Sequence, residues 1–215
     1  MRSGVNAKFF LINMTHIDAI VFDFGGVLID WNPRHVFRQL FNDEEKMEWF
    51  LSNVCTDEWN VQQDKGRLLK EGTALLKASH PEEHHELIEA YYGRWEEMLK
   101  GEISETVEIL HELRKKYKVY GLTNWSSETF PIAQQRFSFL HVFEGVVVSG
   151  EEKMIKPDPA IFRLLIERYG LVPEHSLFID DNIKNTTAAQ RLGFQAIHFT
   201  SAGELRNKLE ELKLL

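Results

Sequence analysis

The chain has 215 residues, of which 43% are hydrophobic and 27% are charged. This composition is typical of a folded globular protein and excludes an intrinsically disordered chain. The 33 acidic residues outnumber the 25 basic ones and give a net charge of −8, which makes nucleic acids and anionic membranes poor partners. The single cysteine, Cys55, cannot form a disulfide within the chain, so we expect a cytoplasmic protein.

Residues 1–16 are predicted to be an extension ahead of the first strand. Their apolar core, Phe9 to Ile12, is too short for a signal peptide, and no small-residue cleavage pattern follows it. No apolar run in the sequence approaches the roughly 20 residues that a membrane helix needs. The sequence therefore predicts a soluble protein with no membrane partner.

Five segments rich in Val, Ile and Phe are predicted as β-strands, and helical patterns separate the later ones. Strands that alternate with helices of this length indicate βαβ units and a parallel sheet. The predicted strands are Asp18–Phe24, Tyr117–Thr123, Val142–Ser149, Ser176–Ile179 and Gln195–Phe199. The predicted helices between and after them are Ser126–Phe137, Pro157–Tyr169, Ile183–Leu192 and Ala202–Leu212.

The alternation breaks after the first strand, where helix follows helix. The predicted helices there are Pro33–Phe41 behind an Asn32 cap, Asp43–Ser52, Gly66–Ser79 and Pro81–Leu99, with a loop over residues 58–66. A further helix, Glu105–Lys116 with Ser104 as its cap, is predicted to cross over to the second strand. Because a crossover needs only about a dozen residues, residues 31–101 are predicted to form an inserted helical domain. The sheet domain then consists of residues 17–30 and 102–215.

Groups suited to binding phosphate or metal stand at or just beyond the ends of these strands. They are Asp23 in IVFDFGGVLID, Thr123 and Asn124 in VYGLTNWS, Lys156 in EEKMIKPDP, and Asp180 and Asp181 in SLFIDDNIKN. The carboxyl ends of parallel strands lie along one edge of the sheet. We therefore expect these side chains to meet in one active site.

The three aspartates predict a nucleophile and a metal site. A carboxylate at a strand end, such as Asp23, can attack a substrate and form a covalent intermediate that water later hydrolyses. Together with Asp180 and Asp181 it would form a cluster whose repulsion costs several kcal/mol at an effective dielectric constant of about 20. A divalent cation relieves that repulsion, and an all-oxygen ligand set with room for water and phosphate suits Mg²⁺.

Lys156, Thr123 and Asn124 are candidates for binding the substrate's phosphoryl group. Lysine acts on a phosphate as a mobile point charge. Thr123 and Asn124 offer a hydroxyl and an amide just before a predicted helix, and free N–H groups at helix N-termini bind anions. In the inserted domain, Trp59, Asn60 and, at its hinge, Trp31 are predicted to face the substrate, with ordinary packing as the alternative.

The order and position of these motifs resemble the haloacid dehalogenase-like hydrolases, over roughly Ile17 to Phe199. The resemblance implies an α/β fold with a Rossmann-like parallel-sheet core in three layers, α/β/α, and an inserted helical-bundle cap domain. By the family's pattern, Asp23 would be both nucleophile and Mg²⁺ ligand. The carbonyl of Gly25 and the Asp181 carboxylate would be further ligands, and Asp180 a ligand or an outer acid.

The same resemblance assigns the phosphate-binding groups. Lys156 would hold both the nucleophile and the phosphate, while Thr123, Asn124 and Gly26 would bind phosphoryl oxygens. Residue 25 departs from the pattern, because most phosphatases of the family carry there a second Asp that protonates the leaving group. Such acid/base catalysis is worth roughly 10²–10⁴-fold in rate. Water or a cap residue would have to protonate the leaving group instead, and the first cap residues to consider are Asn60, Asp64 and Lys65.

The predicted function is a Mg²⁺-dependent phosphatase that acts on a small phosphorylated metabolite through an aspartyl-phosphate on Asp23. A sugar 1-phosphate is one candidate substrate. Two alternatives are a metal-independent 2-haloacid dehalogenase and a catalytically silent metabolite-binding or interaction protein. The adjacent acids Asp180 and Asp181 argue against the dehalogenase, because without a cation they would repel an anionic substrate. Both a monomer and a homodimer are compatible with the sequence.

Overall fold

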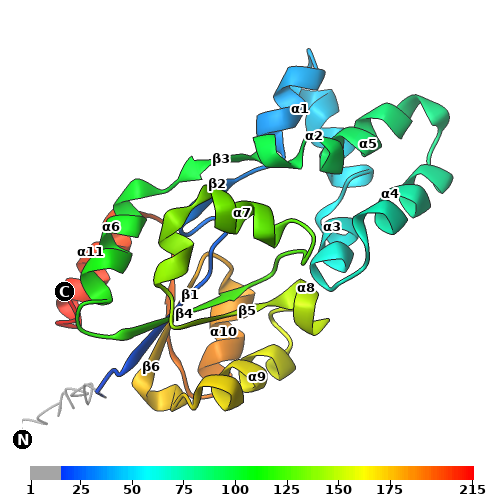
Figure 1. The fold of residues 1–215 in the computed structure, drawn as a ribbon. Coiled ribbons are helices and arrows are strands. Elements are labelled where there is room, and N and C mark those ends of the chain that lie inside the picture. Colours follow the sequence, from blue (N-terminus) through cyan, green and yellow to red (C-terminus); the bar gives the residue numbers. More distant parts are fainter. Residues whose placement is uncertain (1–15) are drawn as a thin grey trace, which may run out of the picture.

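The computed structural model describes residues 16–215, and the predicted extension before His16 lies outside the described residues. A five-stranded parallel sheet in the order β5-β4-β1-β6-β7 forms its centre (Figure 1). The strands are β1 Ala19–Phe22, β4 Lys118–Thr123, β5 Gly145–Val148, β6 Ser176–Asp180 and β7 Gln195–His198. Within this part of the chain, no helix has the length and apolar character needed to cross a bilayer.

The central strand β1 is buried on both faces, as expected for a parallel sheet covered on two sides. All four residues of its sequence AIVF are buried. Ile20 and Phe22 pack into one apolar core, whereas Ala19 and Val21 pack into the other. The strand pairs with β4 on one side and with β6 on the other. Its carboxyl end therefore lies between the ends of two neighbouring strands.

Helices cover both faces of the sheet and give the predicted three layers. The first core cluster includes buried side chains of α6 Ser104–Leu113, α7 Phe130–Arg136 and α11 Ala202–Glu211. The second includes those of α9 Pro159–Tyr169 and α10 Ile183–Arg191. The predicted α/β fold with a Rossmann-like parallel sheet is confirmed.

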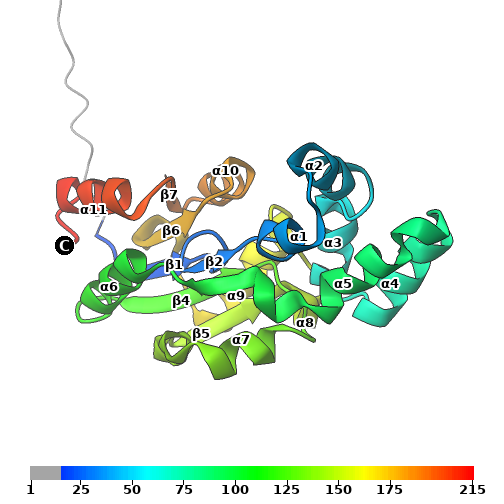
Figure 2. The same ribbon diagram turned by 90° about the horizontal axis from the view of Figure 1, so that it is seen from above.

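Two short antiparallel strands carry the chain away from the sheet and back. They are β2 Ile29–Trp31 and β3 Leu99–Glu102. Between them lie α1 Arg34–Leu40, α2 Glu44–Asn53, α3 Asp57–Asp64, α4 Leu69–Ala78 and α5 His85–Gly93, with 3₁₀ turns at Glu82–His84 and Trp95–Met98. We call these five helices the cap helices; Figures 1 and 2 show them together at one end of the molecule. The domain boundaries at residues 31 and 101 stay a prediction.

Residues 57–64, predicted as part of a loop, form helix α3 instead. Its sequence DEWNVQQD lacks a continuous apolar stripe, so periodicity gave no helical signal. The helix is started by Thr56, whose hydroxyl accepts a hydrogen bond from the Trp59 N–H at 3.2 Å. Asn60 and Asp64 lie one turn apart in it and therefore point in similar directions.

Two other predicted helices in this region were too long. Helix α4 begins at Leu69 rather than at Gly66, because Gly66 has φ +99°, which no right-handed helix accommodates. The predicted helix Pro81–Leu99 breaks after Gly93, where Arg94 leaves the helical region with φ −120°. In the crossover helix, Ser104 is the first helical residue and supplies no side-chain cap.

The segment after β4 also differs from the prediction. Helix α7 begins at Phe130 with Pro131 in its first turn, so residues 126–129 form a turn in which the Ser126 hydroxyl accepts the Glu128 N–H at 3.2 Å. Strand β5 begins only at Gly145, because Ser138–Val142 form a 3₁₀ turn. A four-residue helix, α8 Ser149–Glu152, follows β5, and a 3₁₀ turn, Pro173–His175, precedes β6.

The end of α3 is fastened to the sheet domain at the start of α8. The Ser149 hydroxyl donates to the Asp64 carbonyl at 2.5 Å and accepts the Trp125 N–H at 2.9 Å. A β-carbon on Gly66 would lie 2.9 Å from the Gly150 carbonyl oxygen. The two backbones approach closely here because neither residue carries a side chain.

Two further hydrogen bonds fasten the cap helices. The Leu69 N–H, at the start of α4, donates to the Glu128 carboxylate at 2.6 Å. The Arg136 guanidinium donates to the Glu96 carbonyl at 2.9 Å. The segment that follows β4 therefore contacts the cap at several points, which fixes the position of α3 over the sheet edge.

Substituting Gly150 tests this close packing. A β-carbon there would lie 2.5 Å from the Ser127 nitrogen and 2.8 Å from the Trp125 carbonyl oxygen. Overpacking of this kind costs about 1–3 kcal/mol, so we expect Gly150→Ala to lower Tm by roughly 5 °C. Gly203→Ala in α11 is the control, because a β-carbon there meets no atom within 4 Å; it should leave Tm unchanged or raise it. Equal Tm values for the two variants would contradict this account.

Candidate active site

The carboxyl ends of three adjacent strands bring the predicted residues together. Asp23 directly follows β1, Thr123 ends β4, and Asp180 ends β6. The register places Phe22 opposite Gly121 in one neighbour and opposite Ile179 in the other. The predicted meeting of Asp23 with the later motifs is confirmed by the geometry.

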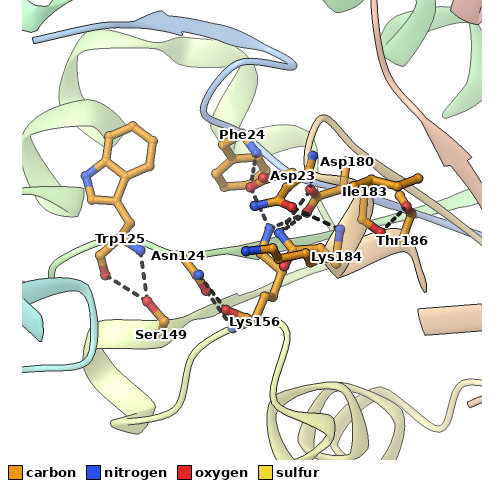
Figure 3. Close-up of polar contacts among 12 residues, drawn as sticks. Asp23, Phe24, Asn124, Trp125, Ser149, Lys156, Asp180, Ile183, Lys184 and Thr186 are labelled. Atoms are coloured by element: carbon orange, nitrogen blue, oxygen red, sulfur yellow. Dashed lines mark hydrogen bonds and ion pairs between the residues drawn. The ribbon is translucent and has the colours of Figure 1, made fainter. Parts of the chain in front are cut away.

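The Lys156 ammonium group lies between two of the carboxylates (Figure 3). Its Nζ is 2.9 Å from Asp23 Oδ1 and 2.7 Å from Asp180 Oδ2. The side chains of Lys156 and Asp180 are almost fully buried, and Asp23 is only 8% exposed. Attraction to the two aspartates outweighs burial and raises the pKa of Lys156, although burial alone would lower it. The lysine is therefore charged at this site.

Asn124 holds the backbone of Lys156 in place. Its amide Nδ2 donates to the Lys156 carbonyl at 3.0 Å, and its Oδ1 accepts the Lys156 N–H at 2.8 Å. This two-point contact joins the end of β4 to the loop before α9. Asn124, predicted to bind phosphoryl oxygens, thus has a clear structural role in positioning Lys156, and its phosphate contact stays a prediction.

The paired acids have different environments. Asp180 accepts hydrogen bonds from the Asn182 N–H at 2.8 Å and from the Asn185 amide at 3.0 Å, in addition to Lys156. Asp181 is exposed, and its Oδ2 would lie only 2.3 Å from a β-carbon on Gly26. Gly26 also has φ +73°, so both the turn and the approach of Asp181 require glycine.

Asp23, Asp180 and Asp181 each place a carboxylate oxygen within 4.8 Å of the others. Burial raises the pKa of Asp23 to about 8, and the negative charge of Asp180 and Asp181 adds to that rise while Lys156 opposes it. One ammonium group thus faces three carboxylates. The three carboxylates carry more negative charge than the one ammonium group can balance, and Asp181 is open to solvent. Their oxygen atoms can therefore hold a divalent cation.

A cavity of about 70 Å³ adjoins the turn that follows Asp23. Its walls combine aromatic rings with amide and carboxyl groups. The lining residues are Gly25, Trp31, Asn60, Asp64, Trp95, Asn124 and Trp125. The volume is several times the roughly 10–15 Å³ that a cavity needs in order to hold one water molecule. In this arrangement of the cap, the cavity admits a group of a few non-hydrogen atoms.

The structure places the predicted cap residues differently. Asn60 and Trp31 line the cavity, and their contact with a substrate stays a prediction. Trp59 does not line it: its indole N–H donates to the Gly72 carbonyl at 3.0 Å and its ring packs on Tyr91. The ordinary packing role is therefore the correct one for Trp59, because an indole with its one donor satisfied inside the cap stabilises the cap core.

The structure bears on two further predictions about phosphate binding. The Gly26 N–H donates to the Ile29 carbonyl at 2.9 Å, so that N–H is not available to a ligand, and phosphate binding by Gly26 stays a prediction. The expected helix N-terminus beside Ser126 is absent, because α7 begins only at Phe130. An anion site built on the helix N-terminus is thus not found at Asn124.

Sequence reasoning missed Trp95, Trp125 and Ser149. Trp125 directly follows the Thr123–Asn124 motif, and that adjacency to a strand end was a usable signal. Trp95 comes from the far end of the cap and packs edge-to-face on Trp125 with ring centres 5.7 Å apart. No sequence pattern relates these two rings, because 30 positions separate them in the chain.

Comparison with known proteins agrees with this geometry. A family model described as haloacid dehalogenase-like hydrolase matches residues 17–193. The drimenol cyclase drtB of Aspergillus calidoustus is 30% identical over 95 residues, which are 44% of this chain but only 18% of that protein. The sesquiterpene phosphatase astK of Aspergillus oryzae is 24% identical over 189 residues, 87% of this chain and 92% of that protein.

Among solved structures, a HAD-family enzyme from Bacteroides thetaiotaomicron is similar over most of its length. Its magnesium complex is 26% identical, with a TM-score of 0.68 over 90% of this chain and 98% of that one. The wild-type protein has also been solved with magnesium and inorganic phosphate; that structure is 25% identical, with a TM-score of 0.64 over 86% and 95% of the two chains.

The cavity carboxyl Asp64 should make stability depend on pH. Burial raises its pKa to about 7, above that of an unfolded aspartate, so its contribution to stability is lost as pH rises from about 4 through 7. Asp64→Asn removes this loss, and we expect its Tm relative to the wild type to be a few degrees higher at pH 8.5 than at pH 5. Thermal unfolding at both pH values measures this, with Asp57→Asn on the exposed start of α3 as the control. A relative Tm of Asp64→Asn that does not change with pH would contradict the prediction.

Proposed function

Because this chain belongs to the haloacid dehalogenase-like hydrolases, we propose that it is a Mg²⁺-dependent phosphatase acting on a small phosphorylated metabolite, with Asp23 as its nucleophile. The observation that carries the proposal is the buried contact of Asp23 with Lys156, 2.9 Å away, at the edge of a small cavity. A carboxylate held in one orientation beside a fixed positive charge is suited to attack a phosphorus atom.

In the first step, a carboxylate oxygen of Asp23 forms a bond to phosphorus while the bond to the leaving-group oxygen breaks. Lys156 offers its ammonium group both to Asp23 and to a phosphoryl oxygen. Thr123 contributes a hydroxyl at the end of β4. In the second step, water attacks the aspartyl-phosphate and releases inorganic phosphate, which restores the Asp23 carboxylate.

The proposed ligands of Mg²⁺ are the carboxylates of Asp23 and Asp181 and the carbonyl of Gly25. Asp180 is buried and already accepts hydrogen bonds from three donor groups, so we assign it to holding Lys156 rather than to the metal. Bound Mg²⁺ would neutralise the carboxylates and polarise the phosphoryl group. The magnesium complex of the Bacteroides thetaiotaomicron enzyme supports this choice of ion.

The cavity suits a small polar leaving group. Its indole rings at Trp31, Trp95 and Trp125 can pack on the few sugar atoms that lie next to the phosphate, and Asn60 offers an amide for a hydroxyl. A sugar 1-phosphate is a substrate of this kind. Its anomeric oxygen also leaves more readily than an alkyl alcohol oxygen.

The dehalogenase alternative is less well supported. A haloacid carries its own carboxylate, which would enter beside Asp23, Asp180 and Asp181 with one lysine to balance them. Assays distinguish a phosphatase, a dehalogenase and a binding protein. Phosphate release that requires Mg²⁺ supports the phosphatase, halide release in EDTA supports the dehalogenase, and the absence of both supports a binding protein.

Asp23→Asn should abolish phosphatase activity while leaving the fold intact, because the amide is nearly isosteric but not nucleophilic. We expect kcat to fall by at least about 10³-fold in a screen of phosphorylated metabolites with Mg²⁺. Asp18→Asn, at the opposite end of β1, is the matched control and should retain activity. Turnover by Asp23→Asn close to that of the control would overturn the mechanism.

The two adjacent acids should respond differently to substitution. Asp181→Ala removes a hard oxygen ligand and should raise the Kd for Mg²⁺ by tenfold or more, about 1.4 kcal/mol, with little change in Tm. Asp180→Asn weakens the hydrogen bonds that Lys156, Asn182 and Asn185 make to a buried carboxylate and should destabilise the fold by about 1.5–3 kcal/mol. Calorimetric titration with Mg²⁺ and thermal unfolding measure the two effects. The reverse pattern would exchange the assigned roles.

A further inference from the structure

We infer that Asp64 is the catalytic acid of this site and replaces the carboxyl group that is absent at Gly25. The inference rests on the proposed phosphatase function and adds to it the residue that protonates the leaving group. Gly25 supplies no acid beside the nucleophile Asp23, and a residue of the cap helices takes over the protonation step.

Gly25 and Asp64 border the same cavity. A β-carbon placed on Gly25 meets no atom within 4 Å, so the space that a side chain at this position would enter is empty. Gly25 and Asp64 both line the cavity of about 70 Å³. A leaving-group oxygen beside Gly25, two residues after Asp23, would therefore share this small space with the Asp64 carboxyl group.

The Asp64 side chain is held in a fixed position by groups from both parts of the molecule. The Asn60 amide, one helical turn earlier, donates to Asp64 Oδ2 at 3.1 Å. Tyr92 in α5 orients that amide by donating to Asn60 Oδ1 at 2.8 Å. From the sheet domain, the Ser126 N–H bonds to Asp64, and Ser149 donates to its carbonyl at 2.5 Å.

This carboxyl group is placed where a negative charge is unfavourable. It belongs to the last residue of α3, the end at which the helix dipole disfavours an anion. Among residues 16–215, no lysine, arginine or histidine forms an ion pair with it. Burial raises the pKa of Asp64 to about 7, so it still carries a proton near neutral pH. Such a group adds little to stability but suits a general acid.

Nearby polar groups are poorer candidates. The Asn60 amide does not release a proton in water, and the Asn124 amide already bonds to both backbone groups of Lys156. Lys65 is exposed, and it is not part of the cavity wall. Asp64 is thus the titratable side chain in the lining of this cavity.

The proposed step conserves atoms and charge. As Asp23 bonds to phosphorus, the electron pair of the breaking P–O bond passes to the leaving-group oxygen, and Asp64 gives that oxygen its proton. Asp64 is then a carboxylate. It accepts a proton from the water molecule that attacks the aspartyl-phosphate, so that both aspartates return to their starting states.

The dependence of rate on the leaving group tests this assignment. We would measure kcat/KM with Mg²⁺ for aryl and alkyl phosphates that cover a wide range of leaving-group pKa. The wild type should show a shallow dependence. Asp64→Asn should lose roughly 10²–10⁴-fold with alkyl phosphates but only a few-fold with dinitrophenyl phosphate, whose leaving group needs no proton.

A matched control and a rescue variant distinguish catalysis from structure. Asp57→Asn makes the same change at an exposed position of α3 and should behave as the wild type. Gly25→Asp combined with Asp64→Asn should restore the shallow dependence, since it returns an acid to the lining of the cavity. A steep dependence that persists in the double variant, with Tm preserved, would count against an acid acting from this cavity.

The remaining outcomes separate the two proposals. If Asp64→Asn loses the same factor with every ester, Asp64 has a structural role, and the assignment is overturned while the phosphatase function stands. If the wild type releases no phosphate from any ester in the presence of Mg²⁺, the proposed function is overturned, and the role of Asp64 falls with it.

Discussion

The Lys156 ammonium group links the carboxyl ends of two neighbouring strands to the loop before α9. It bonds to Asp23 after β1 and to Asp180 at the end of β6, at 2.9 and 2.7 Å, while Asn124 after β4 fixes its backbone. Asp23, Lys156 and Asp180 are buried, and removing the lysine would leave two carboxylates without a compensating charge. The positions of the Asp23 carboxylate, of two strand ends and of the loop before α9 therefore depend on one side chain.

The charges around Lys156 do not balance. Three carboxylates with oxygens within 4.8 Å of one another face a single lysine. Burial raises the pKa of Asp23, and its two acidic neighbours raise it further. A structure selected for stability alone would not keep this excess of negative charge. Binding of a divalent cation would lower the pKa of Asp23 and complete the charge balance, which couples metal binding both to stability and to the reactivity of the nucleophile.

The cap contributes to the chemistry because it is held tightly against the sheet domain. The close approach of Gly66 and Gly150, together with the Ser149 hydroxyl, brings the end of α3 to the cavity. Without this contact Asp64 would lie on a solvent-exposed helix end. The contact thus places the Asp64 carboxyl group, whose negative charge is unfavourable at the end of α3, beside the cavity, where we propose that it donates a proton.

Sequence analysis identified the sheet, the order of its motifs and the meeting of Asp23, Lys156 and the paired acids at one sheet edge. This was possible because apolar strands have a strong local signal, and parallel strands place their carboxyl ends at one edge whatever the intervening sequence. It failed for α3, whose apolar pattern is weak, and for helix ends such as Gly66, where φ is set by packing. The sequence also did not predict that Asp180 is buried whereas Asp181 is exposed.

The amino-acid sequence by itself thus determined which groups stand at the sheet edge, since strand pattern and topology are enough to place them there. Only the tertiary structure decided that Trp95 and Trp125 share a cavity wall, that Trp59 belongs to the cap core, and that Asp64 borders the space left by Gly25. Those relations come from the docking of the cap, which depends on contacts between residues far apart in the chain, and no periodicity or spacing records such contacts.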